Sequence, residues 1–103
     1  MLDAALRGSH PPTAFLVARS LHVLTVMTHL MRRGKRIPQD VALIARDYEP
    51  FLQGTSPMVA HYSTNPVQIA RRISMAVRQL AETGALPAHA IRLMPNFVAG
   101  ETV

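Results

Sequence analysis

One short segment constrains the fold of this chain more than any other. The apolar run 41–45, Val-Ala-Leu-Ile-Ala, is followed at once by the polar residues Arg46, Asp47, Tyr48 and Glu49. A strand buried on both faces has this pattern, as in a parallel sheet covered by helices. Open parallel sheets bind ligands just beyond the carboxyl ends of their strands. We therefore expect a buried strand with Asp47 at a ligand-binding edge; a simple loop cap is the alternative role for this residue.

The other apolar segments predict a single α/β domain with a parallel sheet. Strand, helix and strand from Thr13 to Ala45 make a βαβ unit, and a strand-helix-strand arrangement follows it. Ser20 is expected to cap the first long helix. Asn65 is expected to cap the second, with Pro66 in its first turn. The expected elements are strands over 13–18, 41–45, 59–63 and 91–98, helices over 21–33 and 66–82, and a loop over 50–57. Pro95 places the last strand at a sheet edge or kinks it there.

The first long helix has a wider apolar surface than one sheet face requires. One side of this helix should pack on the sheet. A second side, around Leu24, Met27 and Met31, is then free to meet another chain. Complete burial within its own domain is the alternative that the sequence leaves open.

Composition excludes several classes of function. The 103 residues provide for one domain at most, and 49% are hydrophobic, which is enough for a core. Cysteine is absent, which rules out disulfides, thiolate catalysis and cysteine-based zinc sites. We find no apolar segment long enough to span a membrane. The sequence also has no nucleophile elbow, phosphate loop or zinc-protease motif, so we expect no enzyme, no catalytic residues, no cofactor and no metal.

The net charge of +5 alone would suit a nucleic-acid partner. However, the only cationic cluster, Arg32, Arg33, Lys35 and Arg36, closes the first long helix, where positive charge suits the negative end of the helix dipole. The two long helices are separated by strands instead of a tight turn, so no helix-turn-helix is predicted.

Four segments in order resemble the lactose-repressor (LacI/GalR) family of bacterial transcription regulators. The segment from Ile37 to Asp47 is similar to the family's Val-Pro-Glu-Asp-Val-Ser-Val-Val-Gly-Phe-Asp, and Pro57 falls on the first proline of its Pro-Pro-Leu-Thr-Thr-Val. Residues 12–18 resemble the family's Pro-Thr-Ala strand, and residues 97–102 its closing strand. No single segment is specific, but their order and spacing are.

This resemblance implies a carboxy-terminal part of a two-lobed, periplasmic-binding-protein-like effector domain. Further chain upstream is expected, including the headpiece that binds DNA in the family and that nothing here resembles. The resemblance places ligand contacts at Arg19, Ser20, Arg46, Asp47 and Tyr48. It also implies a small sugar-like or anionic effector, a homodimer and a cytoplasmic location. Arg19 replaces the family's asparagine, so either the effector is anionic or Arg19 pairs with Asp47. A free-standing interaction module and a solute-binding receptor of the same fold are the alternatives.

Overall fold

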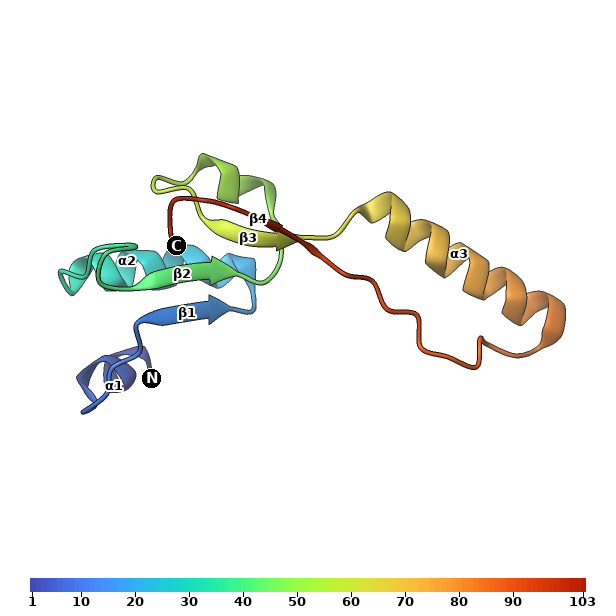
Figure 1. Cartoon of the computed structure of the whole chain (residues 1–103), viewed down its shortest axis with the longest axis horizontal. Helices are drawn as coiled ribbons and strands as arrows, with labels where there is room; N and C mark the ends of the chain where they lie inside the picture. Colours follow the sequence, from blue (N-terminus) through green and yellow to red (C-terminus); the bar gives the residue numbers. More distant parts are fainter. The chain divides into compact units, whose positions relative to one another are not determined.

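The computed structural model describes all 103 residues and shows an α/β chain (Figure 1). Its helices and strands are α1 (Leu2–Arg7), β1 (Ala14–Val17), α2 (Val23–Arg32), β2 (Ala42–Ala45), β3 (Ala60–Ser63), α3 (Pro66–Thr83) and β4 (Asn96–Val98). Short 3₁₀ helices over Ser20–His22 and Pro50–Gly54 complete the list. None of the helices has both the length and the apolar character needed to cross a bilayer. The order of the predicted elements and the α/β fold class are confirmed.

The four strands form one sheet in the order β1-β2-β3-β4. β1 pairs with β2 in parallel from Ala14↔Ala42 to Val17↔Ala45, which confirms the predicted βαβ unit. β2 and β3 are also parallel but pair over only two positions, the second of which is Ala45↔His61.

β4 occupies the far edge of the sheet and runs against β3 (Figure 1). Phe97 lies against Tyr62, with ring centroids 5.3 Å apart, whereas the N–H of Glu101 donates to the carbonyl of Met58 at 2.7 Å. The segment after Pro95 therefore runs antiparallel to β3. The edge position expected from Pro95 is confirmed. The strand itself is shorter than predicted, because residues 85–95 are irregular.

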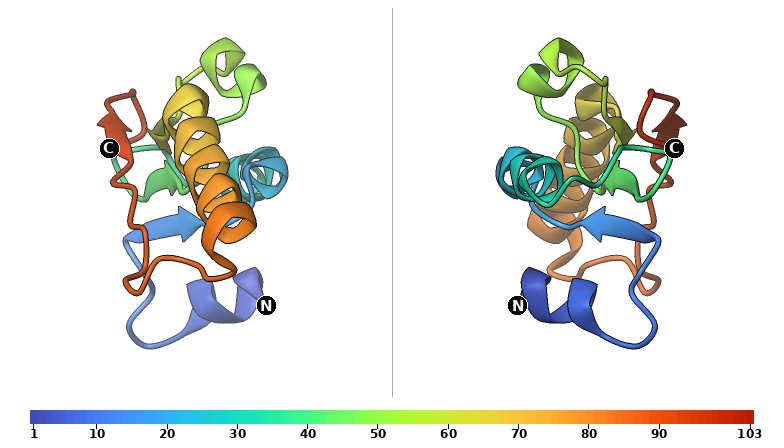
Figure 2. Two further views of the ribbon diagram at one scale, coloured as in Figure 1. Left: turned by 90° about the vertical axis from the view of Figure 1, so that its right-hand side faces the viewer. Right: turned by 90° about the vertical axis from the view of Figure 1, so that its left-hand side faces the viewer.

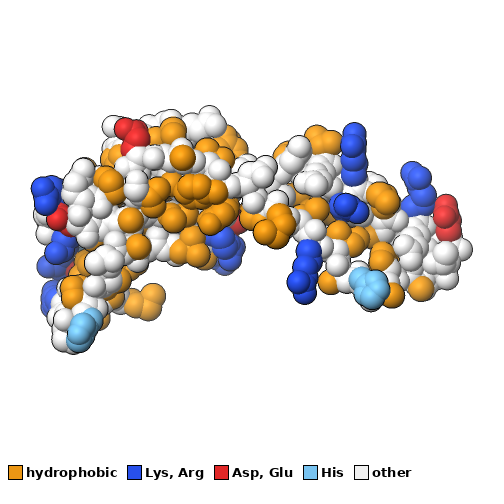
Figure 3. Space-filling model, in the orientation of Figure 1, with side chains coloured by type: hydrophobic (Ala, Val, Ile, Leu, Met, Phe, Trp, Pro, Cys, Tyr) orange, Lys and Arg blue, Asp and Glu red, His pale blue; other side chains and the backbone are white.

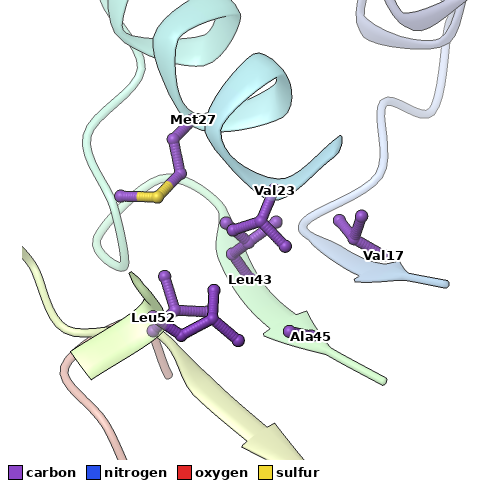
Figure 4. Packing of buried hydrophobic residues seen from close by; sticks show 7 residues of the cluster. Val17, Val23, Met27, Leu43, Ala45 and Leu52 are labelled. Atoms are coloured by element: carbon purple, nitrogen blue, oxygen red, sulfur yellow. The ribbon is translucent and has the colours of Figure 1, made fainter. Parts of the chain in front are cut away.

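Contacts divide the chain into two units. The first, here called the sheet unit, comprises Met1–Ser63 and Phe97–Val103; the second, the helix unit, comprises Thr64–Asn96. The hydrophobic core lies in the sheet unit, where α2 covers one face of the sheet (Figure 2). Figure 4 shows Val23 and Met27 of α2 directed at Leu43 and Leu52.

Met27 corrects one prediction. Its side chain is only 4% exposed and belongs to the core cluster, so Met27 cannot contribute to a surface for another chain. Its neighbours in the predicted surface behave differently, because Leu24 and Met31 are 46% and 60% exposed. Met27 faces the sheet together with Val23 and Leu30, whereas Leu24 and Met31, three and four residues from Met27, lie at the margin of this face and stay exposed.

The segment after β4 is attached to the sheet through Thr102, which is fully buried. The Thr102 carbonyl accepts a bond from the N–H of Leu43 at 2.8 Å. Its hydroxyl donates to the carbonyl of Leu43 and accepts from the N–H of Ala60. This segment therefore fills the gap that the short β2–β3 ladder leaves open.

In the helix unit, α3 has the predicted caps. Asn65 Oδ1 accepts a hydrogen bond from the N–H of Val67 at 2.9 Å, Pro66 is the first helical residue, and Gly84 ends the helix with φ +71°. No residue of α3 is buried. Figure 3 shows hydrophobic side chains at the surface; on α3 the exposed ones include Val67, Ile73, Met75, Val77 and Leu80.

Two local predictions were wrong. Ser20 caps no helix: its side chain makes no capping bond, and the 3₁₀ turn Ser20–His22 precedes α2 instead. The segment 50–57, predicted as a loop, contains the 3₁₀ helix Pro50–Gly54, whose Leu52 is fully buried in the core.

Candidate functional site

The candidate site is the edge of the sheet where β1 and β2 end. Val17 and Ala45 are the last residues of these strands and face each other in the parallel ladder. One further hydrogen bond, from the N–H of Arg46 to the carbonyl of Val17 at 2.9 Å, continues the alignment past the strand ends. The residues that follow, Arg19 on one strand and Asp47 on the other, therefore leave the sheet at the same edge.

Asp47 is paired with its neighbour in sequence. A guanidinium nitrogen of Arg46 donates to Asp47 Oδ2 at 3.0 Å, and both side chains are exposed. The hydrogen bond to the Asp47 carboxylate raises the pKa of the Arg46 guanidinium. Exposed pairs of this kind contribute about 0–1 kcal/mol to stability, so the pair is easily opened by a competing ligand. The suggested pairing of Asp47 with Arg19 is not the one observed.

Arg19 is exposed and has no ion pair in the structure. Its carbonyl accepts a hydrogen bond from the N–H of His22 at 2.9 Å, which fixes the backbone while leaving the guanidinium free. Ser20, the next candidate, is only 7% exposed. Arg19 can thus donate to an anion or a hydroxyl, whereas Ser20 has little surface to offer.

Tyr48 follows Asp47 in the sequence, and its side chain is 37% exposed. Its ring leans against the imidazole of His61, with centroids 5.1 Å apart and planes inclined by 32°. His61 is 2% exposed and stands opposite Ala45 in the β2–β3 ladder. Sequence reasoning found no function for His61, although counting the register from Ala45 would have placed it at the same edge as Asp47.

Two further groups of charged residues form ion pairs elsewhere in the sheet unit. Asp3 accepts hydrogen bonds from His29 Nε2 at 2.8 Å and from Arg33 at 2.6 Å, and Arg33 and His29 together lower the pKa of Asp3. Arg36 binds both carboxylate oxygens of Asp40 at 3.0 Å, and together with a backbone hydrogen bond this lowers the Asp40 pKa to about 2. The cationic cluster at the end of α2 is thus partly neutralised by local partners.

The chain matches known proteins in family and fold. The family model described as "Periplasmic binding protein-like domain" matches residues 1–103. No curated protein matches the sequence.

Several solved structures share the fold. A putative LacI transcriptional regulator from Bacillus cereus subsp. cytotoxis has a TM-score of 0.84 at 20% identity, over 99% of this chain and 36% of that chain. A LacI family regulator from an Arthrobacter species, in complex with lactose, has a TM-score of 0.75 at 24% identity, over 96% and 37% of the two chains. A sugar-binding regulator of the LacI family from Escherichia coli, complexed with phosphate, has a TM-score of 0.68 at 15% identity, over 88% and 32%.

These matches confirm the fold inferred from the sequence resemblance. The chain spans about a third of the length of the solved structures it resembles.

Proposed function

This chain belongs to the family of periplasmic-binding-protein-like domains, and from this premise we propose that it is the carboxy-terminal part of the effector-binding domain of a LacI-like transcriptional regulator. In the intact protein, binding of a small molecule would bias DNA affinity through a change in this domain. Contact with DNA would belong to a separate headpiece. The solved structures with lactose and with phosphate support small-molecule binding as the function of such a domain.

The observation that carries the proposal is the alignment of polar groups beyond β1 and β2. The bond from Arg46 to Val17 brings the continuations of both strands to one edge, where the side chains of Arg19, Arg46 and Asp47 are exposed. A carboxylate accepts hydrogen bonds from neighbouring hydroxyls, and guanidinium groups donate to oxygens. Together they suit a small ligand with several hydroxyls or an anionic group.

The first prediction concerns Asp47. Asp47→Ala removes the acceptor for ligand hydroxyls, and a hydrogen bond to a charged group contributes roughly 1.5–3 kcal/mol. We expect the affinity of the intact protein for its effector to fall by about one to two decades, measured by calorimetric titration. Asp40→Ala is the matched control, since Asp40 is a carboxylate paired with Arg36 outside the proposed site, and it should leave affinity unchanged.

Arg19→Ala then separates the two ligand classes. A large loss of affinity indicates an anionic effector, and a small loss indicates a neutral one, because only an anion depends strongly on the guanidinium charge. If Asp47→Ala remains folded and binds as tightly as the unmodified protein, the assignment of the site to this edge is wrong.

The proposal includes self-association through α2. Leu24 and Met31 expose apolar side chains on the flank of the helix beside the buried Met27, and Leu21 is 76% exposed nearby along the chain. Burying an apolar surface of this kind in a homodimer is more favourable than leaving it exposed to water in the monomer. Met27 takes no part, for the reason given above.

A further inference from the structure

His61 is the only buried histidine of the sheet unit, and its imidazole is held in one orientation. Nδ1 lies 3.0 Å from the carbonyl oxygen of Val59. A carbonyl only accepts hydrogen bonds, so Nδ1 carries the proton and donates. The acceptor is two residues back along the chain, just before β3, and the pairing of His61 with Ala45 joins that strand to β2. The ring is therefore fixed by its own strand and does not depend on a ligand.

Tyr48, in contrast, lies in the segment after β2 and outside any helix or strand. Its ring contacts the imidazole of His61. A centroid separation of 5.1 Å falls within the range of 4.5–7 Å at which aromatic rings attract each other. One part of the Tyr48 ring is covered by this contact, and the side chain as a whole remains 37% exposed.

We propose that His61 is a positioning residue for Tyr48. The contact keeps the Tyr48 ring beside Asp47, so that an aromatic surface for a ring-shaped ligand is in place before the ligand binds. A sugar ring has an apolar face as well as hydroxyls on its edge. The exposed part of Tyr48 would take that apolar face, while the carboxylate of Asp47 takes the hydroxyls. This step rests on the proposed function for its ligand, but the positioning of Tyr48 can be tested without one.

The test without ligand uses proton NMR of the chain. The chain has two tyrosines, Tyr48 and Tyr62, and Tyr62 has its own aromatic partner in Phe97. We expect His61→Ala to shift the ring protons of Tyr48 and to leave those of Tyr62 in place. His61→Phe, which restores an aromatic neighbour, should return the Tyr48 signals toward their original positions. A Tyr48 shift no larger than the Tyr62 shift overturns the proposal.

A reciprocal variant covers the case in which His61→Ala does not fold. Tyr48 is at the surface, so Tyr48→Ala should fold, and its loss should move the imidazole signals of His61. The other histidines, His10, His22, His29 and His89, should keep theirs. Unchanged His61 signals contradict the proposal as firmly as unchanged Tyr48 signals do.

The test with ligand uses the intact protein and lactose as the probe. Both Tyr48→Ala and His61→Ala should weaken lactose binding, whereas His61→Phe should bind more nearly like the unmodified protein. If Tyr48→Ala weakens binding and His61→Ala does not, the positioning role is wrong. If the unmodified protein does not bind lactose, that result counts against a lactose-like effector, and the NMR comparison still decides whether His61 positions Tyr48.

Discussion

At the scale of single residues, Gly100 is the position with the least tolerance. A Cβ on Gly100 would lie 2.5 Å from the nitrogen of Ala60 and the oxygen of Met58, and 2.7 Å from the carbonyl carbon of Val59. These are backbone atoms at the start of β3 and cannot rotate away. We expect Gly100→Ala to lower the free energy of unfolding by about 1–3 kcal/mol, as overpacking typically does, measured by urea denaturation.

Gly54→Ala is the matched control for this variant. A Cβ on Gly54 would meet nothing within 4 Å, and its backbone φ is not in the positive region. The free energy of unfolding should stay within about 0.5 kcal/mol of that of the unmodified protein. Equal stability of the two variants would mean that Gly100 does not pack against β3 as described.

The sequence predicts the positions of site residues better than their partners. An apolar run that stops at Ala45 locates the strand end, and hence Arg46 and Asp47, without knowledge of the rest of the fold. Which arginine pairs with Asp47 depends on side-chain conformations, and the adjacent Arg46 proved to be the partner in place of Arg19. His61 was missed for a related reason: its importance comes from the strand register, which is a property of two segments together.

At the scale of elements, α2 offers the clearest test. Met31→Lys places a charge on the exposed apolar side of the helix and should weaken a homodimer at least about tenfold, or ~1.4 kcal/mol. Sedimentation should show a lower average mass. Thr25→Lys adds the same charge to another exposed position of α2 and should leave the mass unchanged. If both variants sediment like the unmodified protein, α2 is not the surface of association.

Helices were predicted more accurately than strands and turns. Their ends are marked by local chemistry, such as the Asn65 cap, or the left-handed glycines at Gly34 and Gly84. β4 has no comparable signal, because its extent depends on where it meets β3. The width of the apolar arc on α2 was also informative, but it could not show that Met27 faces the core, since that depends on how the helix is rotated over the sheet.

At the scale of the whole chain, the net charge of +5 invites a test of DNA binding. α2 and α3 are separated by β2 and β3, so they cannot form a helix-turn-helix. We expect fluorescence anisotropy at physiological salt to show no preference between operator-like and random duplexes. Weak binding that disappears as salt is raised agrees with this expectation, because charge alone produces it. A clear preference for one sequence contradicts it.

The hydrogen bonds of Thr102 to β2 and β3 affect how much the length of the chain between them can vary. The bond between Thr102 and Leu43 spans 59 residues, and the whole helix unit lies within that span. The entropy cost of closing a flexible loop rises only with the logarithm of its length, by about 0.6 kcal/mol for each doubling. Insertions between Ser63 and Phe97 would therefore be nearly neutral for the sheet unit. The segment between Ser63 and Phe97 can therefore change in length while Thr102 still joins β2 to the start of β3.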